Sequence, residues 1–289
     1  MFDKRHLGGV VLAIVCVAGL WEPAARAAEL QVANVAKVGS GHIQFDITWT
    51  DSWRAKWKES GAGLANWDAA WVFVKFRRKG DSGWSHATLS ARDSDHQAPG
   101  GAEIHVGLTG TRGVGVFLHR SVEGKGKWTN KGVKLKWLPE ADKVKGPAKV
   151  ELSVHAIEMV YVPRGGFYVG GAGKLAGSFT DGAWRKGDDV IPFKITSEAE
   201  LKVAGEPGCL YGTAGLGAAH QIGPVGKLPP AFPKGYPAVY CMKYETNQGQ
   251  YAAVLTHIPT SLAANRYPRP TIPARFSGNG IHTVKKTSA

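Results

Sequence analysis

The sequence predicts a mainly β N-terminal region resembling a β-sandwich, followed by a partial α+β region. Three observations favour this fold class. Apolar and polar residues alternate with a period of two in several short segments before residue 157, as in strands with one buried face. Glycine is abundant, at 38 of 289 residues, which favours turns over long helices. All ten tryptophans lie at or before Trp184, so the composition changes along a chain long enough for two domains.

The first 27 residues are typical of a secretory signal peptide. Lys4 and Arg5 form a basic head, and residues 7–20 form an apolar run too short to span a bilayer comfortably. Residues 25–27, Ala-Arg-Ala, fit a small-x-small cleavage site. We therefore expect a secreted or periplasmic protein with no membrane attachment after cleavage. The alternative is a short membrane anchor; Cys16 lies inside the apolar run and does not form a convincing lipoprotein signal.

The chain is basic, with 36 Lys and Arg against 23 Asp and Glu. Residues 1–27 hold three of the basic and two of the acidic residues, which leaves a net charge of +12 for residues 28–289. Export argues against nucleic acid as the partner of this charge. The densest basic segments are residues 75–80 and 125–136. An anionic envelope polysaccharide or a protein partner is the expected ligand, and a merely solvated basic surface is the simpler alternative.

Two cysteines, Cys209 and Cys241, remain after the expected cleavage. In an oxidising compartment they could form a disulfide. Two small buried thiols are the alternative. Their spacing matches no metal-binding pattern.

Residues 29–38 and 42–49 flank a Gly-Ser-Gly turn and predict a β-hairpin. Ile43, Phe45 and Ile47 alternate with polar residues, so this second strand should bury one face. Further strands follow at turn-separated intervals, which makes an antiparallel sandwich the expected architecture of residues 28–157. These strands are predicted at residues 69–77, 103–108, 113–121, 132–138 and 148–159.

Residues 50–71 interrupt this pattern with a tryptophan-rich segment that we interpret as a loop. Trp53 and Trp57 could stack on a sugar ring, because a flat aromatic face suits the apolar side of a pyranose. The alternative is that the tryptophans of the loop cover the end of the core.

The second region, residues 158–289, opens with a strand, a tight turn and another strand at residues 158–171. Residues 190–195 are strand-like, and residues 205–231, rich in glycine and proline, predict a long loop. The glycine run at 212–217 resembles a phosphate-binding loop. No strand leads into this run and no helix clearly follows it, so it is a weak indication of a nucleotide site.

Residues 236–244 predict a buried strand that turns into a helix. Asn247 can cap the first turn, and Gln250 can complete a capping box. Pro259 should end the helix. The expected apolar stripe of this helix consists of Tyr251, Val254, Leu255 and Ile258.

These two segments resemble the opening of the sulfatase-modifying-factor, or formylglycine-generating-enzyme-like, domain. The resemblance departs from the family pattern in three places: Arg164 stands between the proline and the glycines, Thr246 replaces Val or Ile, and Asn247 replaces Thr. The matching residues of the first segment are Met159, Val160, Val162, Pro163, Gly165, Gly166, Phe167 and Gly170. Those of the second segment are Lys243, Glu245 and Tyr251, with Asn247 as an equivalent helix cap.

The resemblance implies a fold related to C-type lectins for residues 158–289, with only the front of the domain present. Complete family enzymes are copper-dependent oxidases or iron-dependent enzymes, and they also bind calcium. The cysteine pair and calcium-site residues of those enzymes are not found here, and Cys209 and Cys241 do not match the catalytic motif. We therefore expect a truncated, exported family member with no catalytic residue and no cofactor. The alternative is an envelope or cell-surface module that binds polysaccharide or has a structural role.

Other chemistry has little support in the sequence. There is no G-x-S-x-G nucleophile motif, and the acidic residues suggest no glycosidase pair. His105, His119 and His155 alternate with apolar residues, so we expect them on exposed sheet faces and not in a metal site.

Overall fold

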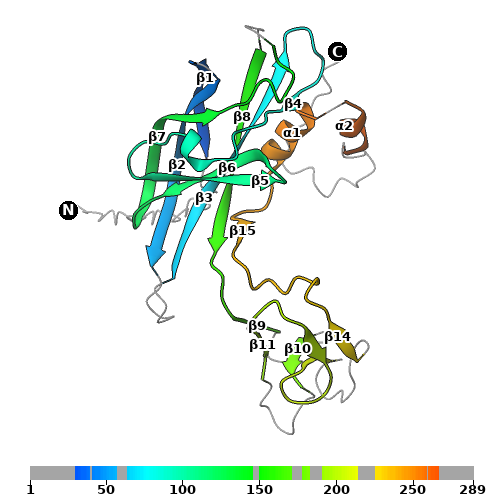
Figure 1. Ribbon diagram of the computed structural model, residues 1–289. Helices are drawn as coiled ribbons and strands as arrows, with labels where there is room; N and C mark the ends of the chain where they lie inside the picture. Colours follow the sequence, from blue (N-terminus) through cyan, green and yellow to red (C-terminus); the bar gives the residue numbers. More distant parts are fainter. Residues whose placement is uncertain are drawn as a thin grey trace, which may run out of the picture.

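The computed structural model describes residues 30–39, 41–56, 64–145, 150–170, 178–182, 191–213, 225–258 and 260–266. Strands dominate these residues, and only two short α-helices occur among them (Figure 1). The mainly β character predicted from the sequence is therefore confirmed. The strands form a nine-stranded, a four-stranded and a two-stranded sheet.

The nine-stranded sheet contains all described strands of the predicted N-terminal region and one strand from much later in the chain. A short 3-10 helix, η1 (Asp93–Asp95), lies between two of its strands. The nine strands are β1 (Gln31–Val38), β2 (His42–Lys56), β3 (Ala65–Arg78), β4 (Ser85–His86), β5 (Ala102–Thr109), β6 (Arg112–Arg120), β7 (Gly124–Lys136), β8 (Val150–Val162) and β15 (Val239–Met242).

Two long strands, β2 and β3, organise the sheet. β2 pairs antiparallel with β1 and β7, and β3 pairs antiparallel with β8, β6 and β4. The ends of β2 and β3 pair with each other, and β5 continues the sheet beyond β6. The predicted hairpin is confirmed as β1 and β2, whose turn uses positive φ angles of 51° at Gly39 and 89° at Gly41.

One apolar cluster joins β2, β3, β6 and β7. The predicted alternation in β2 is confirmed, because Ile43, Phe45 and Ile47 are fully buried and Trp49 is 1% exposed. Burying side chains of this size contributes about 1.5–3 kcal/mol each, so this cluster is the main source of stability of the sheet.

The segment 50–71 is not a loop, and this prediction was wrong. β2 continues to Lys56, β3 begins at Ala65, and both pair with neighbours through most of the segment. Ladder hydrogen bonds satisfy the backbone of these residues, which explains the extended conformation of a segment without clean alternation. Trp53 therefore lies on a strand, and Trp57 lies outside the described residues.

Two smaller sheets occupy the part of the chain between β8 and β15 (Figure 1). The strand after the predicted tight turn exists as β9, but it pairs with β11 and not with β8. The region expected to be one long loop, 205–231, contains two strands, β13 and β14. The strands of the smaller sheets are β9 (Phe167–Val169), β10 (Ser178–Asp181), β11 (Phe193–Ile195), β12 (Leu201–Val203), β13 (Leu210–Thr213) and β14 (Gly226–Leu228).

The boundary expected between residues 157 and 158 falls inside β8, which runs from Val150 to Val162. Residues 150–158 of β8 pair with β3 alone. Residues 159–161 pair with both β3 and β15, and Val162 pairs with β15. The nine-stranded sheet thus extends past the expected boundary and includes the first residues of the family-like motif.

β15 is an exposed strand, so the prediction of a buried strand at 236–244 was wrong. It pairs only with β8, and Val239 and Met242 are 50% and 43% exposed. Cys241 is exposed on this strand, whereas Cys209 is buried beside β13. Both are free thiols, so the disulfide is not present, and the expectation of two buried thiols holds only for Cys209.

The predicted helix after β15 is confirmed as α1 (Gln248–Thr256), and α2 (Thr260–Arg266) follows it. Both capping-box hydrogen bonds between Asn247 and Gln250 are present. The expected apolar stripe is only partly buried: Leu255 is 6% exposed, but Tyr251 and Val254 are 37% and 42% exposed. No helix among the described residues has the length and apolarity needed to span a membrane.

Candidate functional site

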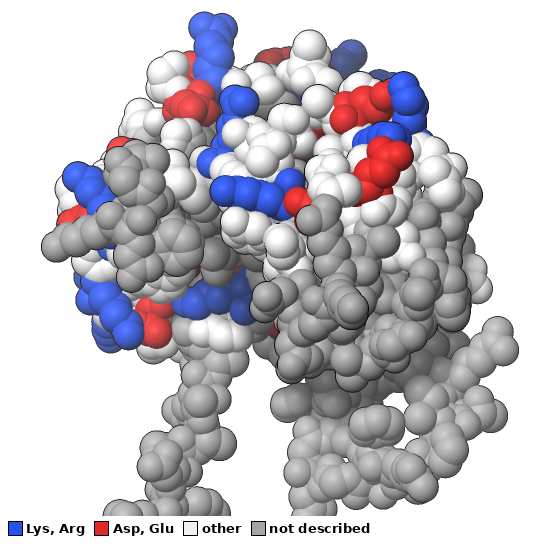
Figure 2. All heavy atoms as spheres, turned by 90° about the horizontal axis from the view of Figure 1, so that it is seen from below, with Lys and Arg blue, Asp and Glu red and all other residues white. Residues whose placement is uncertain are grey.

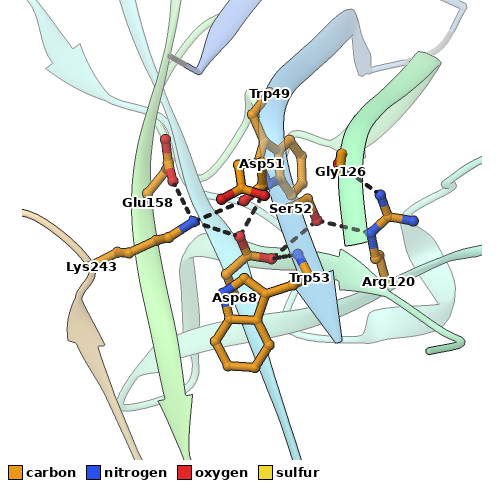
Figure 3. A network of polar contacts seen from close by, with 9 residues as sticks. All are labelled: Trp49, Asp51, Ser52, Trp53, Asp68, Arg120, Gly126, Glu158 and Lys243. Carbon is orange, nitrogen blue, oxygen red and sulfur yellow. Dashed lines mark hydrogen bonds and ion pairs between the residues drawn. The ribbon is translucent and has the colours of Figure 1, made fainter. Parts of the chain in front are cut away.

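Lys243, one of the family-like motif residues, lies at the centre of a buried polar network (Figure 3). Its amine Nζ lies 3.0 Å from Asp68 Oδ2 and 3.2 Å from Glu158 Oε2, and it donates a hydrogen bond of 3.0 Å to the carbonyl of Asp51. The side chains of Lys243, Asp68 and Glu158 are only 11%, 1% and 7% exposed. The network joins β15, β3 and β8 through charged groups that are paired out of water.

Asp68 is held by β2 as well as by Lys243. Its Oδ1 accepts hydrogen bonds from the Ser52 hydroxyl at 3.0 Å and from the Trp53 backbone N–H at 2.8 Å. Its Oδ2 accepts one from the Trp49 indole at 3.4 Å. A register shift in the β2–β7 ladder between Trp49 and Ser52 marks an irregularity that helps to place the Ser52 hydroxyl beside this carboxylate.

Arg120 extends the network to β6 and β7. Its Nε donates to the Ser52 hydroxyl at 3.1 Å and its Nη2 donates to the Gly126 carbonyl at 3.0 Å. Its guanidinium also lies 5.0 Å from the centre of the Trp128 ring. Six strands, β15 included through the adjacent Lys243, are therefore linked by one set of polar contacts.

Burial and pairing act in opposite directions on the ionisable groups. Burial raises the pKa of Glu158, although the nearby Lys243 partly offsets this. Burial acts to lower the pKa of Lys243, but the hydrogen bond and charge of Asp68, together with Glu158, outweigh it and raise that pKa. The ammonium form of Lys243 is thus favoured. A group of charges that satisfy one another in this way fixes strands in place and offers little to a ligand.

The other motif residues are arranged around the start of the smaller sheets and of α1. Gly165 N–H donates to the Tyr236 carbonyl at 3.2 Å. Gly170 has a φ angle of 107° and lies so close to the backbone of Phe179 that no Cβ fits. The remaining residues have structural positions or are exposed: Met159, Val160 and Val162 lie in β8; Pro163 and Gly166 precede β9; Phe167 and Glu245 are exposed; and Asn247 and Tyr251 belong to the cap and body of α1.

A row of lysines on β7 forms a second candidate site. We call Lys125, Lys127, Lys131 and Lys134 the β7 lysine row. They alternate with inward-facing residues such as Asn130 and Val133, so they project from the outward face of the sheet. The first three are exposed and Lys134 is partly exposed. At about 3.3 Å per residue, the row extends over roughly 30 Å.

The β7 lysine row has little compensating negative charge. No ion pair between described residues involves any of its four lysines. The carboxylate of Asp46 is near enough to Lys131 to feel its charge. Hydrogen bonds from Asn34 and from the Gly132 N–H are larger causes of the lowered Asp46 pKa.

Trp53, predicted as a sugar-stacking residue, lies at one end of the β7 lysine row. It is directly opposite Lys125 in the β2–β7 ladder and is half-buried. Directly paired residues on antiparallel strands point to the same side of a sheet. The indole and the first lysine of the row therefore share one face.

Several basic residues outside β7 are paired with acidic ones. On the face seen in Figure 2, most groups of Lys and Arg side chains have an Asp or Glu side chain beside them. Ion pairs such as Lys202–Glu206 and Lys227–Glu200 belong to the four-stranded sheet and its loops. Lysines in such ion pairs are less available to an anionic ligand than the lysines of the β7 lysine row.

The prediction that three histidines lie on exposed faces was wrong for His119, which is completely buried. Its ring lies between the rings of Trp67 and His105, with centroids 4.9 Å and 5.0 Å away. Burial lowers the pKa of His119 to about 4, so its imidazole is neutral at pH 7. Flanking aromatic rings, which alternation alone does not reveal, cover this position.

Glu103, His105 and His119 come close enough together to suggest a metal site. The guanidinium of Arg54 occupies this position, however, with Nη1 at 3.2 Å from His119 Nδ1 and 3.7 Å from Glu103 Oε2. The same Nη1 donates to the Arg120 carbonyl at 2.6 Å. A cation would meet a fixed positive charge, so these residues do not fit a metal ion.

Comparison with protein-family models, curated proteins and solved structures finds no match to this chain. The site must therefore be interpreted from its own geometry. Sequence reasoning missed Asp68, Glu158 and Ser52 as members of the network. The one signal that could have indicated Asp68 was an isolated aspartate directly before the predicted apolar strand 69–77.

Proposed function

We propose that the outward face of β7 binds an acidic polysaccharide of the cell envelope, with the β7 lysine row as the electrostatic site. The observation that carries this proposal is the row of four lysines without ion-pair partners among the described residues. A linear polymer with a carboxylate or sulfate on each repeat can follow an extended strand and meet successive lysines. Opposite charges also raise the association rate and the local concentration of such a ligand.

Trp53 gives this site a second kind of contact. Its position opposite Lys125 lets the apolar face of a sugar ring pack on the indole while an acidic group of the same polymer meets the amine. Trp57, four residues after Trp53, lies outside the described residues. We assign the stacking role to Trp53 alone.

We further propose that the chain is an exported, secreted or periplasmic relative of the sulfatase-modifying-factor family that acts as a binding or structural module. The pairing of β8 with β15 supports this proposal, because it brings the two motif segments side by side although 77 positions separate Val162 from Val239. In this proposal residues 28–157 are the β-sandwich-like part and residues 158–289 have the C-type-lectin-related fold. Copper, iron and calcium are assigned to complete family enzymes and not to the described residues.

The binding proposal predicts a loss of affinity when the β7 lysine row is neutralised. We expect Lys125→Gln with Lys127→Gln to weaken binding of alginate, a polyuronate, by about tenfold, at roughly 0.7 kcal/mol for each exposed ion pair. Raising the salt concentration from 50 to 300 mM should weaken binding by the wild-type protein in the same direction, because exposed charges are screened. Isothermal titration calorimetry on the full chain measures both effects.

The matched control removes the same charge elsewhere. Lys194→Gln with Lys227→Gln should leave alginate affinity within about twofold of wild type, since neither lysine lies on β7. Neutral dextran should not bind. An equal loss in the two double variants would show that only net charge matters and would reject the β7 site, as would an absence of alginate binding at low salt.

A further inference from the structure

A concave site lies between α1 and the outward face of the nine-stranded sheet. Its cavity has a volume of about 300 Å³, which is at the lower end of small-molecule sites. The sheet side is formed by residues of β3, β4 and β8, and the other side by the C-terminal end of α1, including Val254 and His257. Figure 1 shows α1 beside this part of the sheet, far from the smaller sheets.

Flat rings form the sheet side of this cavity. His86, Phe73 and His155 come from the neighbouring strands β4, β3 and β8, and their rings stack nearly parallel. The Phe73 ring lies 5.8 Å from that of His86 and 5.1 Å from that of His155, with interplanar angles of 18° and 13°. Side chains of directly paired strands are held firmly by the ladder, so this surface is preformed.

Trp71 completes this wall and has little room to move away. A Cβ placed on Gly107 or Gly115 would lie 2.5 Å from its indole. These two glycines of β5 and β6 therefore make a slot in which the indole lies against the backbone. His257 closes the opposite side, with its ring edge-on to His155 at 4.5 Å and tilted against Trp84 at 4.7 Å.

The polar groups facing the cavity are all basic. They are Lys75, His86, His155 and His257, and none of the described residues that line the cavity carries a carboxylate. Among the described residues, no ion pair involves Lys75. His257 Nδ1 lies 2.7 Å from the Ala253 carbonyl and His86 Nε2 lies 2.6 Å from the Val114 carbonyl. Each of these two contacts is made by a ring N–H donor, which leaves the second ring nitrogen for a ligand.

Burial lowers the pKa of three basic groups that line the cavity. Burial lowers the pKa of Lys75, and burial followed by the charges of His257 and Lys75 lowers the pKa of His155 to about 4. His86 also has a lowered pKa through burial, although its Val114 contact and the more distant Asp142 act the other way. Burial thus disfavours the protonated, positively charged forms of Lys75, His86 and His155. A bound anion would act the other way and favour those forms.

We propose that this cavity binds a small anion with a flat apolar body, of the aromatic carboxylate class. The carboxylate would pair with the Lys75 ammonium, and the ring would lie against Phe73 and Trp71. This site is separate from the β7 lysine row, so either proposal can fail without the other.

The test uses 2-naphthoate as the probe, with 2-naphthamide as its neutral analogue, and isothermal titration calorimetry on the full chain. We expect saturable binding of one 2-naphthoate per chain, at least tenfold tighter than binding of 2-naphthamide. Lys75→Met should reduce 2-naphthoate affinity to that of the amide. Lys194→Met, a charge change on β11, should leave it unchanged.

A second variant keeps the proposal testable if Lys75→Met does not fold. Val254→Trp places a large side chain at the cavity from a position that is 42% exposed, and it should abolish binding while leaving the circular dichroism spectrum unchanged. Equal affinity for 2-naphthoate and 2-naphthamide would overturn the proposal. So would no saturable binding at 1 mM probe, or unchanged binding in folded Lys75→Met or Val254→Trp protein.

Discussion

Replacing Lys243 by methionine is expected to destabilise the protein by about 3–5 kcal/mol. The change removes the ammonium group and leaves Asp68 and Glu158, which are 1% and 7% exposed, without their buried partner. Two neighbouring carboxylates would then have to stay charged out of water, or one would have to take up a proton. Urea-induced unfolding at pH 7 measures the change in the free energy of unfolding.

A surface lysine provides the matched control for this loss. Lys202 pairs with Glu206, but their side chains are 55% and 69% exposed, so Lys202→Met should cost less than about 1 kcal/mol. Adding Asp68→Asn to Lys243→Met should recover part of the loss, because one uncompensated charge disappears. If Lys243→Met were no more destabilising than Lys202→Met, the network would not hold β15 to the sheet in solution.

The stability of the protein is expected to fall as the pH is lowered from 7 to 5, largely because of two histidines whose pKa burial lowers, the fully buried His119 and the partly buried His155. The pKa of His119 is lowered from 6.5 to about 4 by burial, and that of His155 is lowered to about 4 as well. Between pH 6.5 and 4 the unfolded chain binds protons at these positions and the folded chain does not. Protonation therefore favours unfolding in this window, by about 3 kcal/mol per histidine over the whole of it.

His119→Phe separates this effect from the titration of other groups. The flat ring can keep its place between Trp67 and His105, but it cannot bind a proton. The free energy of unfolding, measured by urea titration at pH 7, 6 and 5, should fall less steeply in the variant than in wild type. The same pH dependence in both proteins would contradict the assignment of His119 as a buried neutral histidine.

Alternation and turn residues were sufficient to predict the mainly β region, its first hairpin and the buried residues of β2. These features depend on local spacing, which the sequence displays directly. The capped helix α1 was also predictable, because Asn247 and Gln250 act within one turn.

The long-range features were not predictable in this way. The pairing of β15 with β8, the ion pair of Lys243 with Asp68 and the burial of His119 all join residues distant in sequence. The extended conformation of residues 50–56 depends on β7 and β3 as neighbours, since the segment itself has no regular alternation. For the proposed β7 site, the sequence indicated Trp53 as a stacking candidate and residues 125–136 as a basic segment, but which lysines share one face became clear only from the strand pairing.

Lysine acetylation footprinting in the presence of alginate would locate the proposed polysaccharide-binding site on β7 lysine by lysine. Acetic anhydride at low dose modifies accessible amines, and mass spectrometry of the digested protein gives the extent at each lysine. We predict that saturating alginate reduces modification of Lys125, Lys127, Lys131 and Lys134 several-fold, and that Lys194 and Lys227 change little. Protection confined to other lysines, or an unchanged pattern with alginate bound, would contradict the claim.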